Sequence, residues 1–164
     1  MCRGRPPPFA LGVLYVGFAL WSLWQWRDVG GARAVYIILA VVWCSDVGAY
    51  VAGRVFGGPR LAPRISPGKT WSGAVGGLAA AIVGGLAVSG TVTGRVAIIA
   101  AVLGVASQLG DLGESALKRA YNVKDSGRML PGHGGLLDRL DGLLAAATVA
   151  GLFLLVAGSR MGSP

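Results

Sequence analysis

The stretch SALKRAYNVKDSGRMLPGHGGLLDRLD, residues 115–141, separates the last two apolar runs of the chain and contains its only histidine. The segment QLGDLGES leads into it, so one predicted helix ends with Asp111 and Ser115, and the next begins with Asp138 and Asp141. Helical residues three or four apart share a face, so each pair can present oxygen ligands in one direction. Two sets of oxygen ligands facing a basic loop suit a metal-bound polyphosphate.

The composition indicates an integral membrane protein. Of the 164 residues, 54% are hydrophobic and only 13% are charged, which is far from the usage of soluble globular domains. The net charge of +8 would suggest nucleic-acid binding in a soluble protein. Here the charges lie between apolar runs, so we expect lipid phosphates and a nucleotide as partners, and no nucleic acid. Two cysteines cannot build a disulfide framework or a metal cluster.

We predict an all-α polytopic membrane protein with about five transmembrane helices, forming a single integral membrane domain over residues 1–164. A membrane-crossing helix needs about 20 apolar residues. The runs that meet this requirement are 9–26, 34–56, 71–89, 96–118 and 135–157. A short polar turn separates the first two, and a loop rich in proline and basic residues, 57–69, follows the second. The glycine and alanine of the third run predict close helix packing.

The basic residues predict the orientation of these spans, because cytoplasmic loops carry an excess of Lys and Arg. Ten fall on the side of the amino terminus: Arg3, Arg5, Arg54, Arg60, Arg64, Lys69, Lys118, Arg119, Lys124 and Arg128. Four fall on the other side: Arg27, Arg33, Arg95 and Arg160. We therefore expect a protein of the cell (inner) membrane whose polar loops face the cytoplasm, where nucleoside triphosphates are available.

Most of the acidic residues lie in or beside apolar runs. They are Asp46, Asp111, Glu114, Asp138 and Asp141, five of the chain's seven. A carboxylate facing lipid is costly, so such residues face a cavity, a partner or an ion. The alternative to an ion site is an interhelical ion pair, such as Asp138 or Asp141 with Arg139 or Arg54.

A second polar constellation occupies residues 46–77, DVGAYVAGRVFGGPRLAPRISPGKTWSGAVGG. Ser66 and Thr70 can offer hydroxyls, and Lys69 a positive charge, to phosphate groups. The letters GKT also occur in the phosphate-binding P-loop, but that motif requires a glycine five residues before Gly68. The residue there is Pro63, so a P-loop is excluded.

The pattern S-x-L-K-R-x4-K-D-x-G-x2-L-P-G-H-G-G-x2-D-R-x-D resembles the signature of the phosphatidate cytidylyltransferase family, the CDP-diacylglycerol synthases. The segment that begins at Asp46 resembles the other hallmark of this family, DxGAYxxGRxFG followed by SPxKTxEG. Gly68 and Ser72 depart from it, since lysine is frequent at the first position and glutamate is usual at the second. The resemblance covers the catalytic part of the family, residues 46–142.

This resemblance implies transfer of CMP from CTP to phosphatidic acid, giving CDP-diacylglycerol and pyrophosphate. It also implies a homodimer and a magnesium ion, with a second cation such as K⁺ beside it. The implied metal ligands are Asp111, Ser115, Asp138 and Asp141, with Glu114 nearby.

The catalytic set expected from the resemblance is Asp111, Asp138, Asp141, Lys118, Arg119 and Lys124. The expected substrate-binding set is Asp46, Ser66, Lys69, Thr70, Arg128, His133 and Gly134. The cations would neutralise the leaving pyrophosphate and the lipid headgroup. His133 would contact the nucleotide or pyrophosphate; the alternative is a loop histidine that hydrogen-bonds to backbone.

Other functions stay open at this point. A CTP-dependent transferase or kinase could act on an ether lipid or a polyprenol, and the chain could be an inactive or truncated membrane subunit. An ion transporter would use the same carboxylates, but no internal repeat is visible. A CDP-alcohol phosphotransferase is excluded, since it needs a DGxxAR-type motif and Asp141-Gly142 is followed by LLAAAT.

Overall fold

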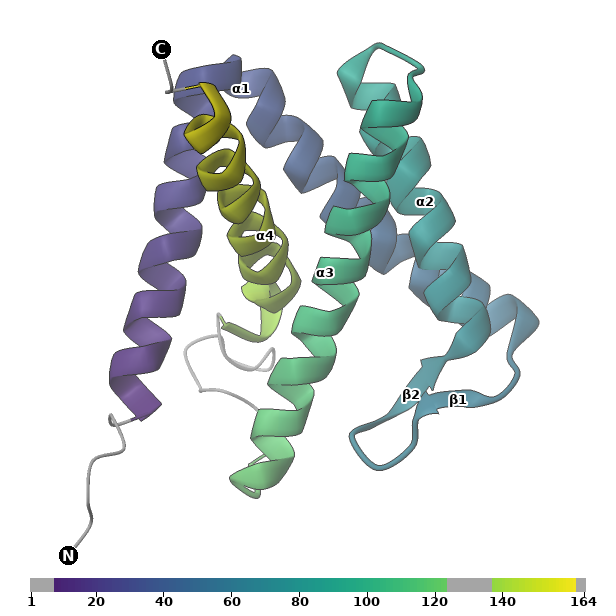
Figure 1. Cartoon of the computed structure of the whole chain (residues 1–164). Coiled ribbons are helices and arrows are strands. Elements are labelled where there is room, and N and C mark those ends of the chain that lie inside the picture. The colour runs from purple at the N-terminus through teal and green to yellow at the C-terminus, as the bar shows by residue number, and fades with distance from the viewer. Residues whose placement is uncertain (1–7, 124–136, 162–164) are drawn as a thin grey trace, which may run out of the picture.

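The computed structural model describes residues 8–123 and 137–161, which form four helices and one β-hairpin (Figure 1). In chain order the elements are α1 (Pro8–Phe56), β1 (Arg60–Ala62), β2 (Ser66–Thr70), α2 (Trp71–Ser89), α3 (Gly94–Ala120) and α4 (Leu137–Met161). Each of these four helices is long and apolar enough to cross a membrane. The predicted all-α polytopic membrane fold is confirmed.

Helix α1 is bent at Gly31, whose backbone has φ 67° and ψ −170°. At about 1.5 Å per residue, a straight helix of 49 residues would be more than twice as long as the hydrocarbon core of about 30 Å. Figure 1 shows α1 as two limbs that meet at one end of the molecule. The first limb (8–30) and the second limb (32–56), together with α2, α3 and α4, correspond to the five predicted spans. The predicted polar turn is a single non-helical residue rather than a loop.

Substituting Gly31 tests this bend. A positive φ costs a residue with a side chain roughly 1–2 kcal/mol, so Gly31→Ala is expected to lower the thermal unfolding midpoint of the protein in detergent. Gly17→Ala, in the first limb, is the matched control. A Cβ there meets nothing within 4 Å, and alanine favours a helix interior by about 1 kcal/mol. Equal stability of Gly31→Ala and the control would contradict the bend.

The second limb of α1 packs closely against α2 through glycines. A Cβ added at Gly76 would collide with Ala52 Cβ, and one at Gly48 with Ala80 Cβ. At Gly84 it would lie 2.6 Å from Cys44 Sγ. Membrane helices approach closely at such small residues, so the predicted tight packing of the third apolar run is confirmed.

The first limb of α1 is joined to α4 by two hydrogen bonds. Ser22 Oγ donates to the Ala147 carbonyl at 2.5 Å, and Trp26 Nε1 donates to the Ala150 carbonyl at 2.9 Å. Ser22 is fully buried. Polar contacts of this kind hold helices together where lipid offers no alternative partner.

Residues 57–69, predicted to be a loop, contain an antiparallel hairpin in which Arg60 is opposite Thr70. The Ile65 N–H donates to the Ala62 carbonyl and closes its turn. The prolines of this segment do not prevent pairing, because a two-stranded sheet has only edge strands. At its base, Ser72 Oγ donates to the Gly57 carbonyl and lies 3.0 Å from Thr70 Oγ1. The serine that replaces the usual glutamate therefore ties the hairpin to the end of α1.

The hairpin, the end of α3 and the start of α4 lie at one end of the molecule (Figure 1). The bend of α1 and the connection between α2 and α3 lie at the other end. Thr70 caps the start of α2 by accepting a hydrogen bond from the Gly73 N–H at 3.1 Å. The second limb, the hairpin, α2 and α3 therefore converge at the end that carries the polar segments.

Candidate functional site

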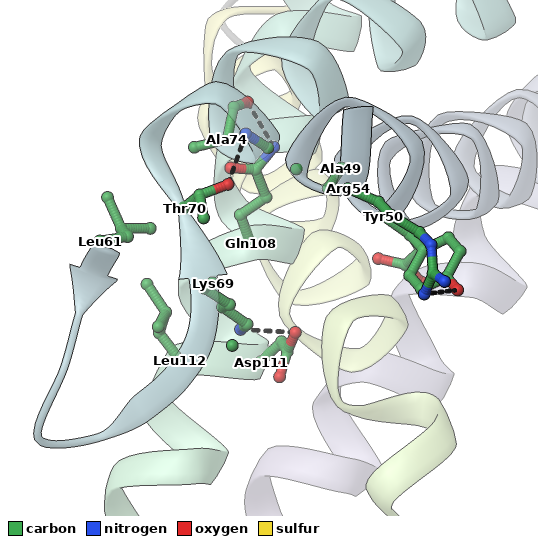
Figure 2. Close-up of a pocket in the computed structure, with 14 residues that line it drawn as sticks. Ala49, Tyr50, Arg54, Leu61, Lys69, Thr70, Ala74, Gln108, Asp111 and Leu112 are labelled. Carbon is green, nitrogen blue, oxygen red and sulfur yellow. Dashed lines mark hydrogen bonds and ion pairs between the residues drawn. The ribbon is translucent and has the colours of Figure 1, made fainter. Parts of the chain in front are cut away.

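A cavity of about 420 Å³ lies between the second limb of α1, the hairpin, the start of α2 and α3 (Figure 2). Its polar lining residues are Asp46, Tyr50, Arg54, Lys69, Thr70, Gln108 and Asp111. Asp46, Tyr50 and Arg54 are four residues apart on one helix and therefore share a face. Three of the predicted substrate-binding residues, Asp46, Lys69 and Thr70, thus line one cavity with the predicted metal ligand Asp111.

Lys69 and Asp111 form an ion pair in this cavity. Lys69 Nζ, on β2, lies 2.5 Å from Asp111 Oδ2, on α3, and Figure 2 shows the two side chains pointing toward one another. Their side chains are 26% and 40% exposed. Asp46 interacts electrostatically with both. The contact brings the two constellations together. Lys69 Nζ itself is buried, whereas the Asp111 side chain remains 40% exposed.

A second charged cluster joins α3 to α4. Lys118 Nζ lies 2.8 Å from Glu114 Oε2 and 3.0 Å from Asp138 Oδ1, and all three side chains are less than one-fifth exposed. Asp141 lies beside Glu114 and also interacts electrostatically with Asp111. The interhelical ion pair considered as an alternative therefore exists for Asp138, with Lys118 as its cation.

The residues predicted to hold magnesium do not form a complete cage. Among the residues that the structure describes, no group of three or more His, Cys, Asp and Glu side chains is arranged to hold a metal ion. Within those same ranges, however, Glu114 Oε1 is buried and has no hydrogen-bond partner, and Asp141 lies beside it. Magnesium typically takes one or two carboxylates, with water and substrate phosphate oxygens completing its shell. The donor set fits a cation of that kind.

The remaining predicted residues are distributed differently. Ser66 begins β2 opposite Ala62 and is not part of the cavity lining. Arg119 donates from Nε to the Ile65 carbonyl at 3.4 Å, so it holds the hairpin turn against the end of α3. Ser115 is half-buried on α3. Lys124, Arg128, His133 and Gly134 lie outside the described residues.

Three polar lining residues were not among the predicted site residues: Tyr50, Arg54 and Gln108. Of these, Gln108 lies on α3. Its Nε2 donates to Ser45 Oγ at 3.2 Å and to the Ala74 carbonyl at 3.1 Å, linking α3 to both α1 and α2. The sequence did contain a signal, since Gln108 is an amide within a predicted membrane span, and polar groups there face the bundle interior or a cavity.

The sequence profile of the family described as "Cytidylyltransferase family" matches residues 7–157. The chain belongs to this family. It is 51% identical over 157 residues to a phosphatidate cytidylyltransferase of Brucella suis, covering 92% of this chain and 57% of that relative. The corresponding protein of Pseudomonas aeruginosa is 46% identical over 140 residues, 82% of this chain and 51% of the relative. That of Staphylococcus saprophyticus is 41% identical over 150 residues, 88% and 57% of the two chains.

The family resemblance of residues 46–142 is thus confirmed and extends over most of the chain. The chain spans about half the length of the curated relatives that it matches.

Proposed function

We propose that this protein is a phosphatidate cytidylyltransferase, which transfers CMP from CTP to phosphatidic acid in phospholipid biosynthesis. The observation that carries the proposal is the ion pair of Lys69 with Asp111, in a cavity at the end of apolar helices. It joins two segments that both resemble the family's hallmarks. Family membership and the names of the relatives support the same reaction.

The reaction makes modest demands on acid–base chemistry. A phosphate monoester has a second pKa of about 6 and is largely a dianion at pH 7, so its oxygen can attack without a strong general base. That oxygen bonds to the α-phosphorus of CTP, the bond from this phosphorus to the bridging oxygen breaks, and pyrophosphate leaves. Catalysis then rests on positioning and on neutralising negative charge.

The residues of the chain supply these two effects in the proposal. Lys69 and Arg54, which line the cavity, neutralise phosphate oxygens, and Lys118, Arg119, Lys124 and Arg128 add positive charge around the same end. Asp111, Ser115, Asp138 and Asp141, with Glu114 nearby, would hold magnesium and a second cation such as K⁺. The bound ions supply charge neutralisation across the phosphates. Thr70 and Ser66 offer hydroxyls, while His133 and Gly134 contact the nucleotide or its pyrophosphate.

The setting of the reaction is part of the proposal. The cavity end of the bundle also carries Arg54, Arg60, Arg64, Lys69, Lys118 and Arg119, and a basic end is expected to face the cytoplasm. We place the protein in the cell (inner) membrane with this end toward cytoplasmic CTP. Acyl chains of the lipid would lie between helices, and two copies would associate as a homodimer.

An assay with two labels tests the reaction. The purified chain, reconstituted with phosphatidic acid and magnesium, is expected to move label from α-³²P CTP, but not from γ-³²P CTP, into lipid. Label from the γ position would indicate a kinase, and transfer to a polyprenol or ether lipid, but not to phosphatidic acid, would indicate another transferase. The absence of both transfer and magnesium-dependent CTP binding would contradict the proposal and favour an inactive subunit.

Removing the divalent ion should stop the reaction. We expect EDTA to reduce CMP transfer to background and added Mg²⁺ to restore it, because the phosphates and the carboxylates of the site would otherwise repel one another. Helical content, measured by circular dichroism, should stay unchanged. Full activity in EDTA would contradict a metal-dependent site.

A further inference from the structure

The amide of Gln108 is held in one orientation. Its Nε2 lies 3.1 Å from the Ala74 carbonyl, which can only accept a hydrogen bond, so the NH₂ group and not the oxygen must face it. The second hydrogen is directed to Ser45 Oγ at 3.2 Å, and Ser45 is fully buried. The two ends of the amide are therefore distinguished by their surroundings.

The packing around Gln108 leaves the amide little freedom. A Cβ added at Gly77 would lie 2.8 Å from Nε2, so α2 makes room for this group with a glycine. A residue that bridges three helices with both of its hydrogens used has a single polar atom left, the carbonyl oxygen Oε1. No donor within residues 8–123 and 137–161 contacts that oxygen.

Gln108 lines the same cavity as the Lys69–Asp111 ion pair. It lies three residues before Asp111 on α3, so both side chains share a face, with Gln108 farther from the end of the helix. Figure 2 shows its side chain reaching from α3 toward Ala74 at the start of α2. A nucleotide whose phosphates lie near Lys69 could therefore place its base toward Gln108.

The atom available there is an acceptor, so it suits a ligand with an N–H donor. Cytosine carries an amino group at C4, whereas uracil carries a carbonyl oxygen at the corresponding position. Opposite a fixed acceptor, the amino group of cytosine forms a hydrogen bond, whereas the carbonyl oxygen of uracil brings two acceptors together. Asp46, which also lines the cavity, adds another acceptor and no donor.

We propose that Gln108 is a specificity-determining residue whose Oε1 accepts a hydrogen bond from the 4-amino group of cytosine and so selects CTP over UTP. This inference rests on the proposed function, because it takes the ligand to be a cytidine nucleotide. It adds to that function the contact that recognises the base.

The test compares Gln108→Met with the unaltered chain. Methionine has a similar length and removes the acceptor, and leaving a polar group unmatched typically costs about tenfold in affinity or more. We expect the preference for CTP over UTP, measured as the ratio of kcat/KM and as the ratio of the two binding constants, to fall at least about tenfold. Gln108→Met also removes contacts to α1 and α2, so a loss of folded protein would lower the activity with both nucleotides. The CTP-to-UTP ratio is independent of such a loss and therefore reports recognition of the base.

Thr93→Ala is the matched control on α3. Thr93 caps the start of this helix by accepting from the Val96 N–H at 3.4 Å, at the end away from the cavity. Losing the cap costs about 1 kcal/mol of stability and should leave the CTP-to-UTP ratio unchanged. An equal loss for both nucleotides in Gln108→Met would show a structural role only and overturn the inference.

A CTP analogue that has hydrogen in place of the 4-amino group provides the second arm. The unaltered chain should bind this analogue about tenfold more weakly than CTP, whereas Gln108→Met should bind the two equally. If the unaltered chain transfers CMP but does not distinguish the analogue from CTP, the inference fails while the proposed function stands. If neither CTP nor the analogue binds, both fail.

Discussion

Asp111→Asn is expected to lower CMP transfer about a thousandfold while the helices remain folded. Asparagine keeps the size of the side chain but removes the charge that faces Lys69 at 2.5 Å and that would bind a cation. A metal contributes several kcal/mol to stabilising transition-state charge, and about 4 kcal/mol corresponds to a thousandfold change in rate. The measurement is initial rate with saturating phosphatidic acid, together with circular dichroism of the same preparation.

Asp28→Asn is the control for this substitution. Asp28 is exposed in the first limb, three residues before Gly31 at the bend of α1. The bend and the hairpin lie at opposite ends of the molecule (Figure 1). The same chemical change there should leave the rate within about twofold, because exposed substitutions away from a site have small effects. Comparable rates for Asp111→Asn and Asp28→Asn would show that Asp111 has no role in the reaction.

Lys118→Met is expected to destabilise the protein by about 3 kcal/mol. The substitution leaves Glu114 and Asp138 without the cation that contacts both, and breaking a buried ion pair by removing one partner costs roughly that amount. For a chain of this size the thermal midpoint should fall by roughly 6–12 °C. Unfolding in detergent, followed by tryptophan fluorescence, measures the change.

Two further variants interpret the result. Adding Glu114→Gln to Lys118→Met should recover part of the lost stability, because it removes one of the two carboxylate charges that Lys118 contacts. Arg95→Met, which alters an exposed cation at the start of the same helix, should change stability by no more than about 0.5 kcal/mol. A midpoint for Lys118→Met that matches the Arg95→Met control would show that the cluster does not hold α3 to α4.

Much of the fold could be predicted because membrane spans are encoded by the length of apolar runs. The run 71–89 predicts the observed bounds of α2, and the run 34–56 predicts the second limb to within two residues. Arg33, Pro59, Lys69 and Gly90 lie at or near the ends of these runs. The hairpin could not be predicted in this way. Its strands have only three and five residues, and the second contains Pro67 and Gly68. Arg119, which is far away in the sequence, contacts the turn, and a local pattern does not contain such a contact.

The candidate site was predictable in its residue types but not in its pairing. Intramembrane carboxylates and SPGKT indicated where charge would gather, and Asp46, Lys69, Thr70 and Asp111 do line one cavity. That Lys69 pairs with Asp111, and Lys118 with Asp138, depends on how α3 is rotated against β2 and α4. A local pattern does not contain that rotation. Gln108 was missed for the same reason, because the orientation of its amide depends on the carbonyl of Ala74 on another helix.

The two hydrogen bonds from Ser22 and Trp26 to α4 have a consequence for biogenesis. Each links residues 124 or 125 positions apart, so the first limb enters the bilayer long before its partner carbonyls have been synthesised. During translation, the Ser22 hydroxyl and the Trp26 indole therefore contact lipid or the insertion machinery before they bond to α4. These two contacts can form only after α4 has left the ribosome, so this part of the bundle closes after both helices have been synthesised.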